Sequence, residues 1–249
     1  MDTARDETLN EPRILIGTPT VESYRPVLPR FILSIKEMHY PHFDMLFVDN
    51  SPTEQNCEYI RALGFNAVWN HPTDQRKMGK ILSNRNIIVD RAISGGYDYL
   101  LFLDQDVMTP TNTISKLVSH EKPICGGVYL SNMVYGSGYA LGPVAVLFTN
   151  TSDFVQRATV DTVQQPRLLE VAGAGFGCCL IRRDVLESVP LRVNFDTGST
   201  EDWLTCHDAR KKVFAAFLDT SIWCEHWSKG RILRFNSQGK VEIIDQNMQ

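Results

Sequence analysis

The sequence lacks a long apolar run, a C-x-x-C cysteine pair and a leader-like N-terminus. Its apolar stretches fall well short of the roughly 20 residues that cross a bilayer, so we expect no transmembrane segment. The first twelve residues are polar and acidic, unlike a secretion signal or a transit peptide. Six cysteines in this setting are typical of reduced, buried thiols. Together these features predict a cytoplasmic protein.

Two further absences limit the functional classes to which the protein can belong. The net charge is only −4, which does not favour nucleic acid as a partner, although a local basic patch would still permit it. No G-x-G-x-x-G follows the first predicted strand, so a dinucleotide-binding site lacks its main support. No internal repeat, low-complexity segment or linker divides the 249 residues. We expect a flexible tail over residues 1–12 and a single domain over residues 13–249.

Strands and helices alternate through the first half of the chain. Short apolar runs with polar ends predict strands, and apolar residues at helical spacing predict the helices between them. The expected strands cover residues 13–17, 44–49, 66–69 and 99–103, and the expected helices cover 31–38, 53–63 and 79–93. Such alternation is typical of βαβ units in a mostly parallel sheet, which predicts an α/β fold.

The second half is less regular. We expect strands over 124–130 and 143–148, joined by a Ser/Gly-rich segment, and then a surface excursion over 151–169. A strand running into a short helix is expected over 178–189, and a further helix over 201–212. The chain should end with two short strands within 215–225 and a closing hairpin over 234–244, whose turn is at Gln238-Gly239. The glycine-rich segment 173–177 either lets the backbone approach a ligand or permits a tight bend.

Two carboxylates directly follow the most apolar strand. Asp104 and Asp106 stand two residues apart after Tyr99–Leu103, and in extended backbone that spacing puts both side chains on one side. Like charges so close repel unless a cation lies between them, and a divalent metal with oxygen ligands is the usual solution. The carboxyl end of a central parallel strand is also where open α/β sheets bind ligands. The alternative is a surface turn with two solvated aspartates.

In their order, these motifs resemble those of the GT-A glycosyltransferases, most closely the inverting enzymes of family 2. The resemblance spans residues 13–227 and rests on Thr18-Pro19 after the first predicted strand, Asp49-Asn50-Ser51 after the second, Asn84-Arg85-Asn86 in a helix, the D-x-D motif, the glycine-rich segment followed by Arg182-Arg183, the Glu201-Asp202 pair and the late His226. It implies a Rossmann-like, mixed and mostly parallel sheet flanked by helices. It also implies a nucleotide-binding half over 13–109 and an acceptor-binding half over 110–249.

The resemblance assigns roles to single residues. Asp104, Asp106 and His226 would hold Mn²⁺ or Mg²⁺, and an imidazole ligand suits Mn²⁺ better. Asp202 would be the base that takes the acceptor proton, with Glu201 beside it, although both acids are also explained by the start of a helix. The residues expected to bind the nucleotide sugar are Thr18, Pro19, Asp49, Asn50, Arg85, Asp104 and Gln105.

The implied reaction is transfer of one sugar from a UDP-, GDP- or dTDP-sugar to an acceptor hydroxyl, for which a glycan is one candidate, with inversion. The chain lacks the Q-x-x-R-W motif of processive polysaccharide synthases, so we expect a non-processive enzyme. Two alternatives remain open. A nonenzymatic sugar-nucleotide-binding module would keep the fold and the metal but would have no use for Asp202. A haloacid-dehalogenase-like phosphatase would place its D-x-D after the first strand, with threonine where this chain has Met108.

Overall fold

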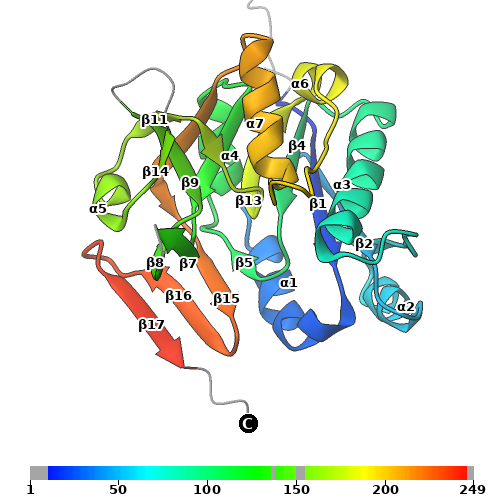
Figure 1. Cartoon of the computed structure of the whole chain (residues 1–249). Coiled ribbons are helices and arrows are strands. Elements are labelled where there is room, and N and C mark those ends of the chain that lie inside the picture. Colours follow the sequence, from blue (N-terminus) through cyan, green and yellow to red (C-terminus); the bar gives the residue numbers. More distant parts are fainter. Residues whose placement is uncertain (1–10, 136–137, 150–154, 246–249) are drawn as a thin grey trace, which may run out of the picture.

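The computed structural model describes residues 11–135, 138–149 and 155–245, and its centre is an eight-stranded sheet in the order β11-β14-β6-β13-β4-β1-β2-β3 (Figure 1). The strands are β1 (Ile14–Thr20), β2 (Phe43–Asp49), β3 (Asn66–Trp69), β4 (Tyr99–Leu103), β6 (Ile124–Val128), β11 (Leu168–Val171), β13 (Cys178–Arg182) and β14 (Ala216–Trp223). Strands β1 to β4 pair in parallel, as does β14 with β6, whereas β13 runs antiparallel between β4 and β6. This confirms the α/β class and the mostly parallel sheet in a single domain.

Helices cover both faces of this sheet. The core on one face includes residues of α1 (Leu28–Lys36), α2 (Gln55–Ala62) and α4 (Thr113–Ser119), and the core on the other includes residues of α3 (Lys77–Ser94), α6 (Arg183–Ser188) and α7 (Glu201–Lys211). Strand β1 shows how the sequence divides between them. Ile14 and Ile16 join the cluster that contains Phe31 of α1, while Leu15 joins the cluster that contains Ile88 of α3. Because successive side chains of a strand point to opposite faces of the sheet, β1 contributes apolar side chains to both cores.

The first strand is longer than predicted. Residues Thr18 to Thr20 lie beyond the strand expected over 13–17, but they extend β1 and pair with β2. A proline is tolerated there because the pairing with β4 ends at Gly17, so Pro19 interrupts no ladder on that side. A 3₁₀ helix, η1 (Glu22–Val27), then leads into α1, which begins at Leu28, three residues before the expected start, and so has Pro29 in its first turn.

The second half contains more β-structure than the sequence indicates. The Ser/Gly-rich segment forms a hairpin of β7 (Leu130–Tyr135) and β8 (Gly138–Pro143), and β9 (Ala145–Phe148), β10 (Val155–Arg157) and β12 (Gly173–Ala174) form a second sheet. From residue 155 onward, the surface excursion expected over 151–169 lies mostly at the surface, and it contains the regular elements β10, α5 (Val160–Val163) and the start of β11. Residues 151–154 and most of the predicted N-terminal tail lie outside the described residues.

A four-stranded sheet closes the chain, at the lower left of Figure 1. It contains β5 (Val107–Met108), β15 (Glu225–Ser228), β16 (Arg231–Phe235) and β17 (Val241–Asp245), in the order β17-β16-β15-β5. The predicted hairpin is confirmed, with Gly239 at a φ of 72° in its turn. The two short strands expected within 215–225 are instead the long β14 and the start of β15. His226 lies within β15 and pairs with Val107, next to the D-x-D motif.

Two expectations drawn from absences concern the whole fold. All six cysteines lie in the described part of the chain, where they are free and buried, as predicted. Among the described residues, the structure contains no helix that is both long enough and apolar enough to span a membrane.

Candidate functional site

The two aspartates of the D-x-D motif lie in a tight turn between β4 and β5. The Val107 N–H donates to the Asp104 carbonyl oxygen at 2.9 Å, so the extended backbone expected for Asp104 and Asp106 is wrong. A turn is needed here because the chain leaves the central sheet and enters the small C-terminal one. Both aspartates nevertheless line one cavity of about 540 Å³ beyond the carboxyl ends of β1 and β4, which we call the donor cavity.

A buried arginine partly neutralises this acidic turn. Arg85 of α3 donates from Nη2 to Asp104 Oδ1 at 2.9 Å and from Nη1 to Glu201 Oε1 at 2.5 Å. Its side chain is only 5% exposed, and its guanidinium lies 5.2 and 5.3 Å from the ring centroids of Phe102 and Phe176. Loss of solvation raises the pKa of Asp104 to about 6, although the neighbouring Arg85 favours its charged form. The charge of the D-x-D turn is therefore balanced in part by the protein itself.

The second aspartate faces the late histidine. His226 Nδ1 lies 2.6 Å from the Leu130 carbonyl oxygen, and because that oxygen can only accept, Nδ1 carries the proton. The lone pair of a neutral His226 is then on Nε2, which lies 3.4 Å from Asp106 Oδ2. Burial lowers the pKa of His226, but Asp106 outweighs that effect and the pKa is raised. His226 Nε2 and Asp106 Oδ2 therefore favour a proton or a metal cation between them.

The protein thus offers two side chains, Asp106 and His226, whose atoms suit a metal ion at this place. A carboxylate oxygen and an imidazole nitrogen suit Mn²⁺, and Mg²⁺ less well. Within the described residues, no group of three or more His, Cys, Asp or Glu side chains is arranged to hold a metal ion. Asp104 Oδ1 is engaged by Arg85 instead. The pair Asp106 and His226 fits a cation whose other ligands come from outside the chain, and the role of Asp104 as a third ligand stays a prediction.

Most of the residues expected to bind the donor line this cavity, and two do not. Those that line it are Pro19, Asn50, Arg85, Asp104 and Gln105. Thr18 and Asp49 are fully buried behind the lining. Asp49 Oδ1 accepts from Ser51 Oγ at 2.7 Å and from Asn56 Nδ2 at 2.9 Å, which fixes the loop after β2. The Asp49 side chain thus holds a loop beside the cavity, whereas the buried Thr18 hydroxyl has no hydrogen-bond partner among the described residues.

Gln105, between the two aspartates, has a similar supporting position. Its carbonyl oxygen accepts from the Thr20 hydroxyl, and its amide donates to the Tyr24 carbonyl oxygen at 3.2 Å. The side chain is 3% exposed. Gln105 therefore ties the D-x-D turn to the segment that follows β1.

The cavity also has lining residues that the sequence reasoning missed. Lys77 and Lys80 come from the first turn of α3, and Tyr24 comes from η1. Burial and the charges of Asp106 and Asp104 raise the pKa of Tyr24. Two lysines at a helix N-terminus are suited to binding phosphate oxygens. The basic run from Gln75 to Lys80 was the available signal, but a surface helix start carries the same composition.

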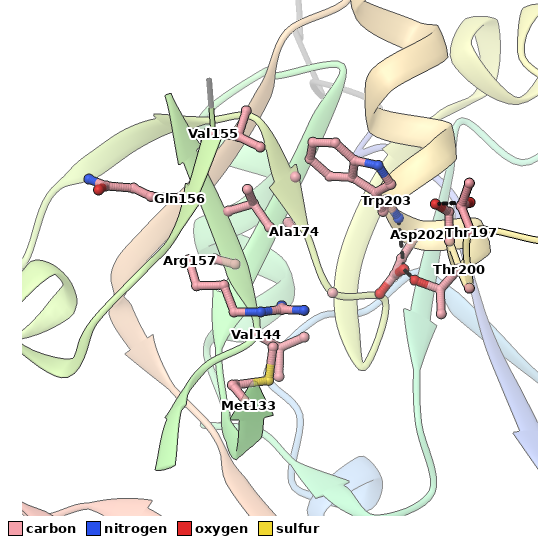
Figure 2. Close-up of a pocket in the computed structure, with 16 residues that line it drawn as sticks. Met133, Val144, Val155, Gln156, Arg157, Ala174, Thr197, Thr200, Asp202 and Trp203 are labelled. Carbon is pink, nitrogen blue, oxygen red and sulfur yellow. Dashed lines mark hydrogen bonds between the residues drawn. The ribbon is translucent and has the colours of Figure 1, made fainter. Parts of the chain in front are cut away.

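A second cavity, of about 560 Å³, lies beside the N-terminus of α7 and is drawn in Figure 2. We call it the acceptor-side cavity. Asp202 lines it, and Asp202 Oδ1 accepts from the Thr200 hydroxyl and from the Trp203 N–H at 2.7 Å. Glu201 does not line it, because Glu201 is turned inward to Arg85. The adjacent acids therefore differ: one closes a buried ion pair, and the other faces a cavity.

The glycine-rich segment forms one wall of this cavity and answers a question that the sequence left open. A Cβ atom on Gly173 would lie 2.8 Å from the Trp203 ring, and one on Gly175 would lie 2.2 Å from the Tyr129 hydroxyl. A Cβ atom on Gly177 would lie 2.6 Å from the Tyr129 ring, and the Gly177 N–H donates to the Tyr129 hydroxyl at 3.1 Å. These three glycines allow aromatic side chains to pack against the backbone, and none of them has a positive φ. Gly173 and Gly175 also line the cavity.

The order of strands, the D-x-D turn and the two cavities can now be compared with known proteins. The family model described as "Glycosyl transferase family 2" matches residues 16–189, which is well over half of the chain. The chain belongs to glycosyl transferase family 2. The match runs from β1 through α6 and so includes the D-x-D motif of this glycosyltransferase. It ends before Glu201, Asp202 and His226, whose placement comes from the structure alone.

Solved structures share the fold of this family 2 glycosyltransferase. A197 from STIV is 19% identical, with a TM-score of 0.54 and 95% of each chain covered. GalNAc-T7 with UDP, GalNAc and Mn²⁺ is 14% identical, with a TM-score of 0.60, and covers 88% of this chain and 44% of that one. TarS 1-349 from S. aureus is 13% identical, with a TM-score of 0.51, and covers 83% of this chain and 57% of that one. Comparison with curated proteins gives no match.

At these low sequence identities, the similarity to the solved structures shows a shared fold alone. The family 2 glycosyltransferase spans about half the length of the GalNAc-T7 and TarS chains, and nearly the full length of A197.

Proposed function

We propose that this glycosyltransferase moves one sugar from a nucleotide-sugar donor to an acceptor hydroxyl, with inversion and with the help of Mn²⁺ or Mg²⁺. One observation carries the proposal. Two adjacent residues at the start of α7 are directed to different cavities. Asp202 lines the acceptor-side cavity, whereas Glu201 binds Arg85, which is part of the wall of the donor cavity. The ion pair fixes the distance between a candidate base and the place proposed for the donor. Fixed placement of this kind is what a displacement reaction requires.

The donor side is supported by its charges. When the anomeric C–O bond breaks, the diphosphate leaves with two developing negative charges, and Lys77 and Lys80 supply positive charge where it is needed. A divalent metal held by Asp106 and His226 would act as a Lewis acid toward the same phosphates. The solved structure of GalNAc-T7 is one with UDP and Mn²⁺, which is consistent with this assignment. Pro19, Asn50 and Asp104 would line the nucleotide and sugar.

The assignment of the acceptor side is supported by the carboxylate of Asp202, which faces the acceptor-side cavity. Its Oδ1 is held by the Thr200 hydroxyl and the Trp203 N–H, which orients the carboxylate. The acceptor oxygen would form its bond to the anomeric carbon as the bond to the diphosphate breaks, and its proton would pass to Asp202. All of the described residues that line the donor cavity fall within 13–109, and all of those that line the acceptor-side cavity fall within 110–249. That division supports the proposed nucleotide-binding and acceptor-binding halves.

The proposal predicts stabilisation by nucleotide sugars. A ligand at 100 times its dissociation constant stabilises the folded state by about 2.7 kcal/mol, so a thermal-shift screen of UDP-, GDP- and dTDP-sugars should give a clear rise in Tm for one nucleotide. The rise should be larger with Mn²⁺ than with EDTA. If no nucleotide sugar raises Tm with or without the metal, the donor assignment is wrong. A nonenzymatic binding module would show the same shift but no transfer of sugar to any acceptor.

The buried ion pairs give a prediction of stability. Arg85→Met should lower the free energy of unfolding by about 3–5 kcal/mol, because Asp104 and Glu201 lose their common cation and Glu201 is left buried. Urea denaturation measures this loss. Arg231→Met is the matched control, since Arg231 pairs with Asp245 on the surface, where both side chains are more than half exposed. The control should cost at most about 1 kcal/mol. Equal losses in the two variants would contradict a stabilising role for Arg85.

A further inference from the structure

The acceptor-side cavity contains an arginine that the proposed chemistry does not use. Arg157 lies at the end of β10, and Figure 2 shows its guanidinium extending across the cavity in the direction of Asp202 on α7. Among the described residues that line this cavity, Arg157 and Asp202 carry the only charges. Within the same described part of the chain, the guanidinium makes no ion pair or hydrogen bond.

This state is unlike that of other arginines near α7. Arg192 donates to Asp208 at 2.6 Å, and Arg210 donates to Glu170 at 3.2 Å while lying over the Phe148 ring. Those contacts fix the two guanidinium groups at the surface. Arg157 instead presents its N–H donors, in a planar fork, to an open cavity. Such a fork matches the two oxygens of a phosphate or carboxylate.

The rest of the cavity suits the uncharged parts of a carbohydrate. Its apolar surface comes from side chains such as Val144, Val155 and Trp203, and its hydroxyl groups come from Thr197 and Thr200. Aromatic and aliphatic surfaces pack against the C–H faces of a sugar ring, while hydroxyl side chains pair with its O–H groups. These groups would bind a neutral sugar as well as an acidic one. Among the described lining residues, Arg157 is the one whose charge favours the acidic sugar.

The charge of the cavity without Arg157 would oppose an anion. Asp202 faces the same space, and the protein as a whole has a net charge of −4. A negatively charged acceptor would have to approach the carboxylate that is to take its proton. A cation on the opposite wall offsets this repulsion and directs the anionic group away from Asp202. For a neutral acceptor, an arginine that pairs with none of the described residues has no electrostatic use in this position.

We infer that the acceptor carries a negatively charged group, a phosphate or a carboxylate, that Arg157 binds while Asp202 faces the hydroxyl to be glycosylated. The inference rests on the proposed function, because it names the class of acceptor for the same reaction. The anionic group and the reacting hydroxyl then belong to one molecule that spans the cavity from β10 to α7.

The test compares acidic and neutral sugars by isothermal titration calorimetry. The probes are glucose 6-phosphate and glucuronic acid, with methyl glucoside as the neutral reference. In the wild-type protein both acidic probes should bind more tightly than the reference. Arg157→Gln should weaken the acidic probes by about tenfold or more, the usual effect of losing a hydrogen bond to a charged group, and should leave the neutral reference unchanged. The preferred acidic probe distinguishes phosphate from carboxylate.

Two control variants identify where the probes bind. Arg210→Gln removes a nearby arginine outside the cavity and should change no affinity. Lys80→Gln removes a cation of the donor cavity, where an anion could also bind. The inference is overturned if the acidic probes show no preference in the wild type, or if their affinity falls in Lys80→Gln and not in Arg157→Gln. Nucleotide binding in Arg157→Gln should match the wild type, so a failure of the donor assignment is seen separately.

Discussion

Turnover of Asp202→Asn should fall by roughly 10²–10⁴-fold, the usual contribution of a general base. Asparagine retains a side-chain oxygen that can accept the bonds from the Thr200 hydroxyl and the Trp203 N–H, so the start of α7 should be preserved. The variant should bind the nucleotide and the metal nearly as the wild type does, because Asp202 does not line the donor cavity. Single-turnover transfer to an acceptor at saturating donor measures the effect on chemistry.

The neighbouring acid is the matched control for this experiment. Glu201→Gln changes the residue bound to Arg85 and leaves Asp202 in place. We expect a smaller loss of turnover than in Asp202→Asn, together with lower stability. If Asp202→Asn remains active while Glu201→Gln is inactive, the two roles are exchanged. If both remain active, the pair only starts the helix, and the inverting mechanism with this base is wrong.

Asp106→Ala should abolish the metal-dependent part of nucleotide binding. The variant removes one of the two side chains whose ligand atoms face each other, leaving His226 Nε2 without its carboxylate partner. Calorimetric titration of UDP and GDP with Mn²⁺ and with EDTA separates the metal-dependent affinity from the remainder. Asp104→Ala should weaken binding without abolishing it, because Asp104 is already engaged by Arg85.

A surface carboxylate provides the control for the metal experiment. Asp245→Ala removes the same type of group at a position 74% exposed and outside the donor cavity, and should leave both titrations unchanged. If the affinity for UDP and GDP in the presence of Mn²⁺ is the same in Asp106→Ala as in the wild type, Asp106 does not hold the metal. His226→Gln should resemble Asp106→Ala if the two residues bind one cation.

The sequence predicts the first half of the fold well, because there each element carries its own signal. Strand β3 and strand β4 have the predicted bounds, and the predicted helix over 79–93 lies within α3. These segments have a clear helical or strand period and end at glycine or polar residues. The second half is different. Its short strands, such as β10 and β12, contain two or three residues, which is too few for any period, and they exist because of the strands beside them.

The candidate site is predictable where function depends on residue type and unpredictable where it depends on pairing. The D-x-D motif and Glu201-Asp202 are visible in the sequence as paired acids. The separation of Glu201 from Asp202 is not, because Glu201 meets Arg85 across 116 residues of chain. Burial of Thr18 and Asp49 behind the cavity was likewise hidden, since a polar residue at a strand end serves a ligand or a loop equally well. That Arg157 pairs with no other residue of the described ranges can be seen only in the three-dimensional structure.

The pairing of β5 with β15 has a consequence for the order in which the protein acquires its site. Asp106 and His226 are separated by 120 residues, and they meet only through a ladder between Val107-Met108 and Glu225-His226. Because a domain generally folds as a unit, this ladder can close only after synthesis has reached Glu225-His226. The donor cavity is lined by residues that leave the ribosome much earlier. The pair of side chains proposed for the metal is therefore completed last, and a nascent chain that ends before β15 lacks it.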